Sequence, residues 1–465
     1  MSPDQIGFAL IYISIFLLLG KLIRIKIPLF QNLFLPSSII GGFLALILGP
    51  QVLGKLFADD HFLANGVMTE GILQVWEALP GLMINIVFAA LFLGATTPTL
   101  KKIWNYGGPQ LAFGWAIGWG QYVIGLLVVL LILVPFYDIP PMAGALIEVA
   151  FEGGHGTAAG MAGTFEELGF PEAFDLAIGL ATVGILSGVI FGIILINWGI
   201  RSGKTKLVKN VKDFSRLKKQ GIMEFQNREP AASMTVRPES IEPLSFHFAI
   251  VSLAVLIGYG LLQGLIWLES VTWGAWTNSE VMTYVPLFPI AMIGGILLQL
   301  IFDKTDRHEV VDRRMIARIQ GFALDILILT AIASVSIDVI GEYFVPFLVL
   351  AVAGIAWNIA GFLILAPRII PRYWFERGIG DFGQSMGVTA TGLLLMRITD
   401  PDNDSPAFEA FGYKQLVYEP LLGGGLVTAL SVPIVAQFGA VPMLVVSAIM
   451  STIGVLTGIF YFGKK

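Results

Sequence analysis

The sequence predicts an all-α polytopic membrane protein made of two inverted five-span repeats, each with a re-entrant hairpin, plus an extra C-terminal span. Three observations predict this class. Of 465 residues, 56% are hydrophobic and only 13% are charged, a composition typical of membrane proteins. Apolar runs of about 20 residues, the length of a membrane-spanning helix, recur along the whole chain. Two glycine-rich polar segments interrupt these runs, one in each half.

The first repeat is predicted over residues 1–200. Its N-terminus lacks the basic start and small-residue cleavage site of a signal peptide, so we expect the first apolar run to be a retained span. A broken segment at residues 143–163 is predicted to form the first re-entrant hairpin. The five spans, bounded by charged or turn residues, are expected at Ile6–Ile23, Phe34–Leu53, Val75–Thr96, Gln110–Pro135 and Phe174–Ile200.

A net basic segment, residues 201–246, is predicted to be a cytoplasmic linker that touches anionic membrane lipids. The second repeat follows at residues 247–439, with its re-entrant hairpin at residues 375–395. Residues 440–465 hold the additional span, Val441–Phe462. The five spans of the second repeat are expected at His247–Leu268, Val281–Phe302, Gln320–Ile340, Tyr343–Pro367 and Glu419–Gly439.

The positions of lysine and arginine orient these spans, because cytoplasmic loops are enriched in both. With the N-terminus outside, only Lys55 of the 28 basic residues falls on the external side. Arg377 and Lys414 are assigned to cytoplasmic segments, and no basic residue is expected inside a span. The linker and the C-terminus are then cytoplasmic, in a multi-pass protein of the inner (plasma) membrane. The two broken segments enter from opposite faces, so the halves are inverted copies.

Repeated patterns support a duplication. A proline followed five residues later by paired glycines occurs in the second span of each half, as Pro36 with Gly41-Gly42 and as Pro289 with Gly294-Gly295. The hairpins also resemble each other, through Thr157-Ala158-Ala159-Gly160 and Thr389-Ala390-Thr391-Gly392. Paired glycines in a span have another explanation, which is close helix packing.

Two discontinuous segments, one in each half, are a sequence indication of the binding site of a secondary transporter. A helix that restarts inside the membrane presents free backbone N–H groups and a partial positive charge. Two such breaks meeting near the midplane would bind a small anion without a buried basic side chain. Exposed carbonyl and side-chain oxygens at the same place suit a hard cation such as Na⁺.

The candidate residues lie mainly in these two segments. The cation site is predicted at Glu152, Asp381, Asn358 and Asp325. The substrate site is predicted at Glu152, Gly153, Gly154, His155, Gly156, Thr157, Gln384, Ser385, Gly387, Thr389 and Thr391.

Several of these residues have an alternative role. His155 is either a substrate or proton ligand, or it holds its loop by hydrogen bonds. Asp381 either coordinates an ion or caps the second half-helix. Asn358 and Asp325 are also explained by interhelical hydrogen bonding. Glu148, four residues before Glu152, is explained by contact with external water.

Other classes of function lack support. The chain has no cysteine, which excludes disulfides, thiolate metal sites and cysteine catalysis. Its four histidines have no metal-ligand spacing, so no transition-metal site is expected. No Ser/His/Asp set is visible, and we predict neither an enzyme nor a nucleic-acid partner.

Three sequence features resemble the bacterial glutamate:sodium symporter family, over about Ile6 to Gly439. These are Gly153-Gly154-His155-Gly156-Thr157, the span with Pro36 and Gly41-Gly42, and Gly387-Val388-Thr389-Ala390-Thr391. The resemblance implies two inverted halves, a homodimer, and Na⁺-coupled uptake of glutamate by elevator-like movement of the core. It also implies that the hairpin residues carry the substrate and Na⁺, with no other cofactor.

The chain departs from the family pattern in three places. Ala158-Ala159 replaces a usual glycine, the tip of the second hairpin is reshaped, and an eleventh span follows the repeats. Ser447, Ser451, Gly454 and Gly458 of that span could pack against a partner subunit or against the same chain.

Two other functions stay open. The same fold could carry another organic anion, such as a hydroxycarboxylate, or couple to H⁺ through Glu152 or His155. An ion channel is a rival from another class, although the acids of the two hairpins do not form the repeated ring of a selectivity filter.

Overall fold

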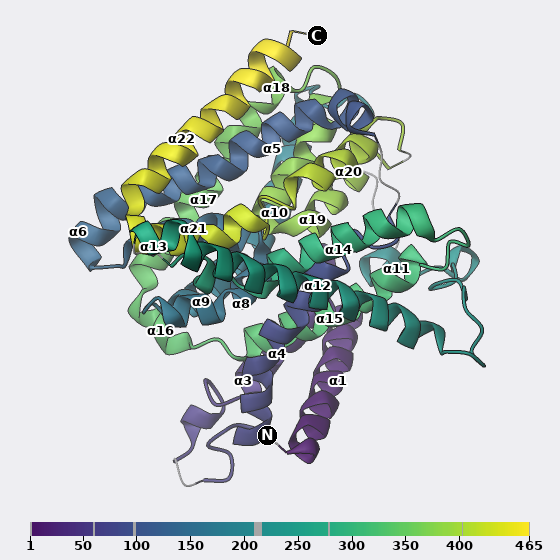
Figure 1. The fold of residues 1–465 in the computed structure, drawn as a ribbon, viewed down its shortest axis with the longest axis vertical. Helices are drawn as coiled ribbons and strands as arrows, with labels where there is room; N and C mark the ends of the chain where they lie inside the picture. Colours follow the sequence, from purple (N-terminus) through teal and green to yellow (C-terminus); the bar gives the residue numbers. More distant parts are fainter. Residues whose placement is uncertain are drawn as a thin grey trace. The chain divides into compact units, whose positions relative to one another are not determined.

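The structure is a computed structural model that describes residues 2–58, 61–95, 99–208, 216–277, 280–401 and 403–464. Within these residues all regular secondary structure is helical (Figure 1). In the described part of the chain, nine helical segments are long and apolar enough to cross a membrane: Pro3–Lys26, Glu70–Ala89, Ile103–Tyr137, Ala173–Arg201, Pro243–Val271, Leu287–Thr305, Arg313–Ala333, Phe344–Ile369 and Ala440–Phe462. They correspond to nine of the eleven predicted spans.

The other two predicted spans correspond to shorter apolar helices. Phe34–Leu53 contains α3 (Ser37–Leu48), which begins after Pro36 and ends at Gly49, the residue before a proline. Glu419–Gly439 contains α21 (Leu426–Phe438), which begins only after a run of three glycines. Proline or glycine residues bound both helices, because neither residue favours a helix interior. Thr96, residues 209–215 of the linker and Lys465 lie outside the described residues.

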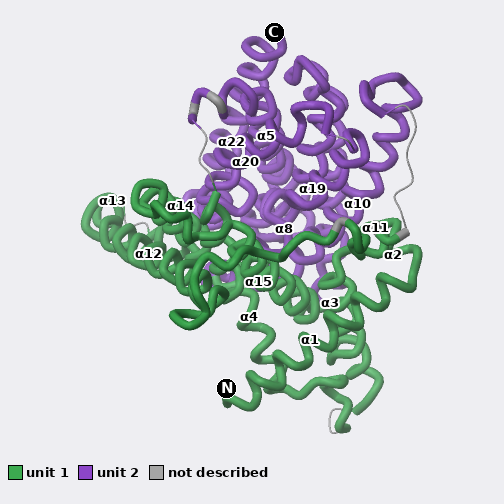
Figure 2. The backbone as a smooth tube through the Cα atoms, turned by 90° about the vertical axis from the view of Figure 1, so that its right-hand side faces the viewer, with its two compact units in different colours: residues 1–96, 159–163, 214–337 green, residues 97–158, 164–213, 338–465 purple. Residues whose placement is uncertain are grey.

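The chain forms two compact units (Figure 2). Unit 1 comprises residues 1–96, 159–163 and 214–337; unit 2 comprises residues 97–158, 164–213 and 338–465. Each predicted repeat therefore contributes nearly all of its first three spans to unit 1, and most of its hairpin with the later spans to unit 2.

The helices of unit 1 are α1 (Pro3–Lys26), α2 (Pro28–Asn32), α3, α4 (Glu70–Ala89), α11 (Arg216–Lys219), α12 (Pro243–Val271), α13 (Trp273–Thr277), α14 (Leu287–Thr305) and α15 (Arg313–Ala333). Local sequence fixes several of their starts. Ser2 and Gln5 form a capping box at α1, which satisfies two backbone N–H groups that a helix leaves free.

Asp312 caps α15 and ties the linker to unit 1. Its carboxylate accepts hydrogen bonds from the backbone N–H groups of Ser233, Arg314 and Met315, at 2.6, 2.6 and 3.2 Å. Partial burial raises the pKa of Asp312, but these donors outweigh it and hold that pKa below its usual value.

The linker makes a second attachment at α1. The Nζ of Lys21 donates to the carbonyls of Gln220 and Gly221 at 3.1 and 2.7 Å, and Gln220 Nε2 donates to Ile25 O at 3.1 Å. This part of the predicted linker is therefore attached to α1 by hydrogen bonds.

The packing of unit 1 occurs twice, with the two halves of the chain exchanged. Helix α3 packs against α1 and α15, whereas α14 packs against α12 and α4. A Cβ atom added at Gly41 would lie 2.6 Å from the carbonyl oxygen of Phe16 in α1. One added at Gly294 would lie 2.3 Å from the carbonyl oxygen of Ala254 in α12. Glycine is needed at both positions because the backbones approach so closely.

The second glycine of each pair faces a helix from the other half of the chain. A Cβ atom at Gly42 would lie 2.9 Å from Cβ of Ile332 in α15, and one at Gly295 would lie 2.3 Å from the carbonyl oxygen of Ala89 in α4. Close helix packing, the alternative explanation of the paired glycines, is thus confirmed.

Unit 2 holds α5 (Leu100–Val128), α6 (Val134–Tyr137), α7 (Leu146–Phe151), α10 (Ala173–Arg201), α17 (Phe344–Ile364), α18 (Ala366–Ile369), α19 (Trp374–Thr399), α20 (Ala407–Tyr418), α21 and α22 (Ala440–Thr457). Three short helices cross the boundaries between the units: α8 (Gly154–Gly160), α9 (Ala162–Glu167) and α16 (Ile337–Glu342). A π-helical turn, Val129–Leu133, joins α5 to α6.

The additional C-terminal helix, α22, packs along α5 of the same chain. Ser451 Oγ donates a hydrogen bond to Ala116 O at 2.9 Å. A Cβ atom at Gly454 would lie 2.9 Å from Ala116 N, and one at Gly458 would lie 2.7 Å from Ile369. The small residues of this helix therefore serve packing within the chain.

Candidate functional site

The first predicted hairpin contains a broken helix, and the break itself lies in unit 2. Helix α7 ends at Phe151 and α8 begins at Gly154, so Glu152 and Gly153 lie between them. Gly154 has φ +68°, a left-handed conformation that glycine adopts without the strain of a Cβ atom. The Oγ1 of Thr157 donates to Gly153 O at 3.0 Å, which satisfies a carbonyl at the break. Gly156 is buried in α8.

The second predicted hairpin contains a break inside α19. Gly387 and Val388 leave the helical conformation, and Val388 has φ +61°. A β-branched residue is strained in this region, and strained residues are concentrated at functional sites. Thr391 Oγ1 donates to Gly387 O at 2.5 Å, the counterpart of the bond between Thr157 and Gly153.

The two breaks contact each other. A Cβ atom at Gly154 would lie only 2.2 Å from Cγ1 of Val388. The Oγ of Ser385 donates to Glu152 Oε1 at 2.5 Å, and both residues are buried. The structure thus brings together the two segments that the sequence predicts to meet.

Two amide side chains hold the second break in place. Gln121 Nε2 donates to the carbonyl oxygen of Ser385 at 2.7 Å and to Asn358 Oδ1 at 3.1 Å. Asn358 Nδ2 donates to the same carbonyl at 3.1 Å. Asn358 therefore makes the interhelical hydrogen bonds considered above as its alternative role. Gln121 was not among the predicted residues, because one glutamine in a long apolar helix gives no distinctive signal.

Lys414 corrects one prediction. It lies in α20 rather than in a cytoplasmic loop, and its side chain is fully buried. Its Nζ lies 3.2 Å from Asp381 Oδ1 and donates to Gln384 Oε1 at 2.5 Å. Helix α20 has only 12 residues and contains Glu409 as well as Lys414, so it does not stand out as an apolar run.

Arg377 is also buried and 5% exposed, not a solvated cytoplasmic residue. Its Nε donates to Gln110 Oε1 at 3.1 Å, and its Nη2 donates to Tyr106 O at 3.0 Å. The expectation that basic side chains stay out of the site is therefore wrong. An ammonium group lies beside the second break, and a guanidinium lies one helical turn before Asp381.

Buried acceptor oxygens surround the contact between the breaks. Glu152 Oε2, Asp381 Oδ2 and Gln121 Oε1 accept no well-formed hydrogen bond from the described residues. Tyr418 and Gln110 lie near the two carboxylates without aligning with them. Buried oxygens normally have a hydrogen-bond donor, and clustered oxygen ligands are what a hard cation binds. The arrangement suits a cation.

Glu148 does not reach external water, because it is fully buried. Its Oε1 accepts from the backbone N–H of Gly423 and from Thr428 Oγ1, both at 2.9 Å, and its Oε2 accepts from Tyr122 OH at 2.5 Å. The carboxylate thus joins α7 to α5 and to the glycine-rich break before α21. The sequence signal for this third break is Gly423-Gly424-Gly425.

The His155 side chain contacts α10. Thr182 Oγ1 donates its proton to Ile178 O at 3.1 Å, and His155 Nε2 lies 2.9 Å from the same hydroxyl. Because a hydroxyl has one proton, this arrangement suits a hydrogen bond donated by Nε2 to the Thr182 hydroxyl. This contact fits the hydrogen-bonding alternative for His155.

Thr389 and Asp325 are the remaining candidates. Thr389 Oγ1 donates to Glu419 Oε1 and accepts from Gln415 Nε2, both at 2.9 Å. Asp325 belongs to unit 1, in α15, where it lies beside Ser38. The residues of the cluster described above all belong to unit 2.

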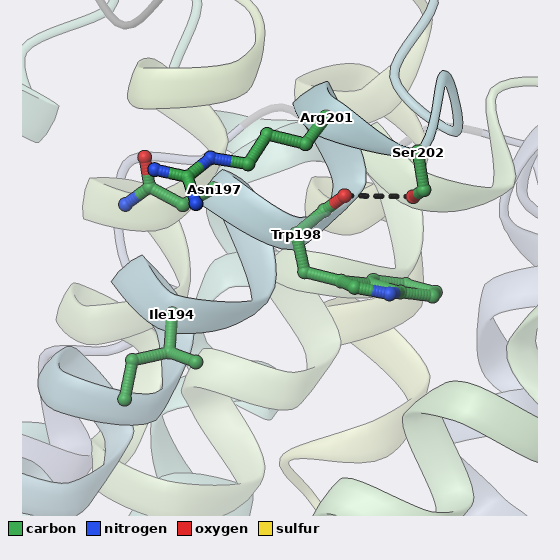
Figure 3. A pocket seen from close by; sticks show the side chains of 5 residues that line it. All are labelled: Ile194, Asn197, Trp198, Arg201 and Ser202. Carbon is green, nitrogen blue, oxygen red and sulfur yellow. Dashed lines mark hydrogen bonds between the residues drawn. The ribbon is translucent and has the colours of Figure 1, made fainter.

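A groove of about 540 Å³ lies at the C-terminal end of α10 (Figure 3). In that view Trp198 and Arg201 point in different directions, and Ser202 Oγ donates to Trp198 O at 2.7 Å. The groove contains none of the predicted site residues. It is lined by Ile194, Asn197, Trp198, Arg201 and Ser202.

Comparison with protein families gives a match to the sodium/glutamate symporter over residues 5–391. A comparison with curated proteins gave no match. The family match includes both breaks described above, together with most of the membrane-spanning helices. The chain therefore belongs to the sodium/glutamate symporter family and is a multi-pass, Na⁺-coupled membrane transporter.

Proposed function

We propose that this protein couples the entry of Na⁺ to the uptake of glutamate or a related acidic amino acid. The observation that carries the proposal is the contact between two broken helices around buried, undersatisfied oxygens. Broken helices of this kind provide transporters with substrate and ion sites.

Sodium is proposed to bind at Glu152 and Asp381, beside the Gln121 amide. Among the described residues, one oxygen of Glu152 and both oxygens of Asp381 lack a well-formed hydrogen bond, and Asp381 Oδ1 forms the ion pair with Lys414. Asn358 supports this site indirectly, since its amide orients the Ser385 carbonyl. A bound cation would also offset the acidic charge of the cluster, which an anionic substrate would otherwise increase.

The substrate is proposed to lie where the two breaks meet. Gly153, Gly154 and Gly156 let a ligand approach the backbone closely. Thr157 and His155 hold the first break, and Gln384, Ser385, Gly387, Thr389 and Thr391 form the second. Its carboxylates would face the backbone N–H groups of the breaks, and its ammonium group would face acidic oxygens of the cluster.

Movement is proposed to be elevator-like, with unit 2 carrying the site. The division of each repeat between two compact units supports this proposal. The exchanged packing of α3 and α14 in unit 1 supports an inverted duplication. We further propose a homodimer in the inner membrane, with the N-terminus outside and the linker and C-terminus in the cytoplasm.

The test is uptake of radiolabelled glutamate into proteoliposomes containing the full chain. We expect uptake with an inward Na⁺ gradient and little without it, and stronger competition by aspartate than by citrate or malate. Uptake that does not depend on Na⁺ would remove the coupling. Citrate competing better than glutamate would reassign the substrate to the hydroxycarboxylates.

A further inference from the structure

The side chain of Lys414 packs against Gly114 of α5, which has no side chain of its own in that space. A Cβ atom at Gly114 of α5 would lie 2.6 Å from Lys414 Cε and 2.9 Å from Nζ. The glycine therefore leaves the space that the lysine fills. Lys414 also lies beyond residue 391, where the family match ends.

Three electron-rich groups of the described residues lie close to the Lys414 ammonium. The Asp381 carboxylate lies 3.2 Å away, the Gln384 amide oxygen 2.5 Å away, and the centroid of the Tyr418 ring 3.8 Å away. A carboxylate, an amide oxygen and an aromatic face all attract a cation. Both members of the ion pair are fully buried, so water does not solvate either charge.

The pair leaves other oxygens of the cluster available. Asp381 Oδ2 and Glu152 Oε2 have no well-formed hydrogen bond from any residue that the structure describes. Glu152 interacts electrostatically with Lys414 and with Asp381. One resident positive charge is thus placed next to oxygens that suit a second, exchangeable one.

We propose that the Lys414 ammonium is a resident cation of the transport site. It occupies a position at Asp381 that a sodium ion fills when the lysine is absent. The wild-type protein therefore completes its cycle with one bound sodium ion fewer than a protein without this lysine would need. The inference rests on the proposed sodium coupling, and it concerns the number of ions rather than the substrate.

The test is equilibrium binding of ²²Na⁺ to the purified full-length protein in detergent. Lys414→Gln removes the charge, and a buried carboxylate without a partner needs a new counter-ion. We expect this variant to bind one more sodium ion per chain than the wild type. Lys414→Arg, which keeps the charge, should bind the wild-type number.

The matched control is the double variant Lys414→Gln with Asp381→Asn, which lacks both charges. It should bind at least one ion fewer than Lys414→Gln, because the carboxylate that would hold the extra ion is gone. An extra ion in this double variant would overturn the proposal, as would an unchanged or smaller number in Lys414→Gln.

Thermal unfolding covers the case in which Lys414→Gln is unstable. Sodium chloride, compared with choline chloride, should raise its melting temperature more than that of the double variant. Equal sodium effects would overturn the proposal, and so would failure of Lys414→Gln to fold at every sodium concentration while the double variant folds. Wild-type glutamate uptake independent of Na⁺ would contradict the proposed function without altering these ion counts.

Discussion

Gly154→Ala should force the two broken segments apart. The added Cβ atom would lie 2.2 Å from Cγ1 of Val388, and Gly154 has φ +68°. A side chain in the left-handed region costs about 1–2 kcal/mol. Inserting an atom into a packed contact costs about 1–3 kcal/mol more. We therefore expect the variant to lose about 2–5 kcal/mol of stability and most of its transport activity.

Two further variants separate these contributions. Val388→Ala removes Cγ1, so the double variant with Gly154→Ala should recover the steric part and retain only the backbone part. Gly169→Ala is the matched control, because Gly169 has φ +77° but no atom within 4 Å of an added Cβ. It should show a backbone cost of about 1–2 kcal/mol and little loss of transport.

Thermal unfolding in detergent and Na⁺-driven uptake in proteoliposomes are the assays. A normal melting temperature and normal uptake for Gly154→Ala would refute the contact between the breaks. Failure of Val388→Ala to restore any stability to Gly154→Ala would refute the steric explanation.

Three other predictions concern residues around the site. Glu148→Gln places an N–H group where the carboxylate accepts three hydrogen bonds. We expect a loss of about 1–3 kcal/mol of folding stability, measured as a lower melting temperature. An unchanged melting temperature would contradict this role of Glu148. Gly454→Leu should separate α22 from Ala116 of α5 and cost about 1–3 kcal/mol, whereas Gly81→Leu, with no atom within 4 Å of an added Cβ, should be tolerated; equal melting temperatures would argue against the packing. Asp312 has a pKa lowered in the folded state, so its charge stabilises the fold above its unfolded pKa of about 4, and this contribution is lost as the pH falls through the lower folded pKa. Asp312→Asn, which keeps a capping side chain, should therefore melt below the wild type at pH 7, and the difference should shrink below about pH 4; a constant difference would exclude the carboxylate charge as its cause.

The helical framework could be predicted from the sequence because most of it depends on local composition. Long apolar runs between charged or turn residues predict membrane spans, and nine such helices are present in the described residues. The broken segments were also predictable, because His155 and its neighbouring glycines are conspicuous in an apolar chain. The shortened α3 could have been expected from Pro36 and Gly49-Pro50, which punctuate it.

The polar partners of the site could not be predicted in the same way. Lys414 is a buried residue, but its helix is short and carries other charges, so hydropathy places it in a loop. Its pairing with Asp381 joins residues 33 positions apart, and only tertiary packing brings them together. Gln121 and Tyr122 face the site from a long apolar helix, where periodicity alone does not distinguish them from packing residues.

Cysteine labelling tests most directly whether the meeting point of the two breaks is the transport site. The chain has no cysteine, so a single Thr389→Cys substitution in the second break provides one reactive group. Sodium and glutamate together should slow its reaction with a thiol reagent, whereas Asn65→Cys, in a loop of unit 1, should react at the same rate with or without them. A Thr389→Cys rate that neither sodium nor glutamate changes, in protein that still transports, would contradict a site at this position.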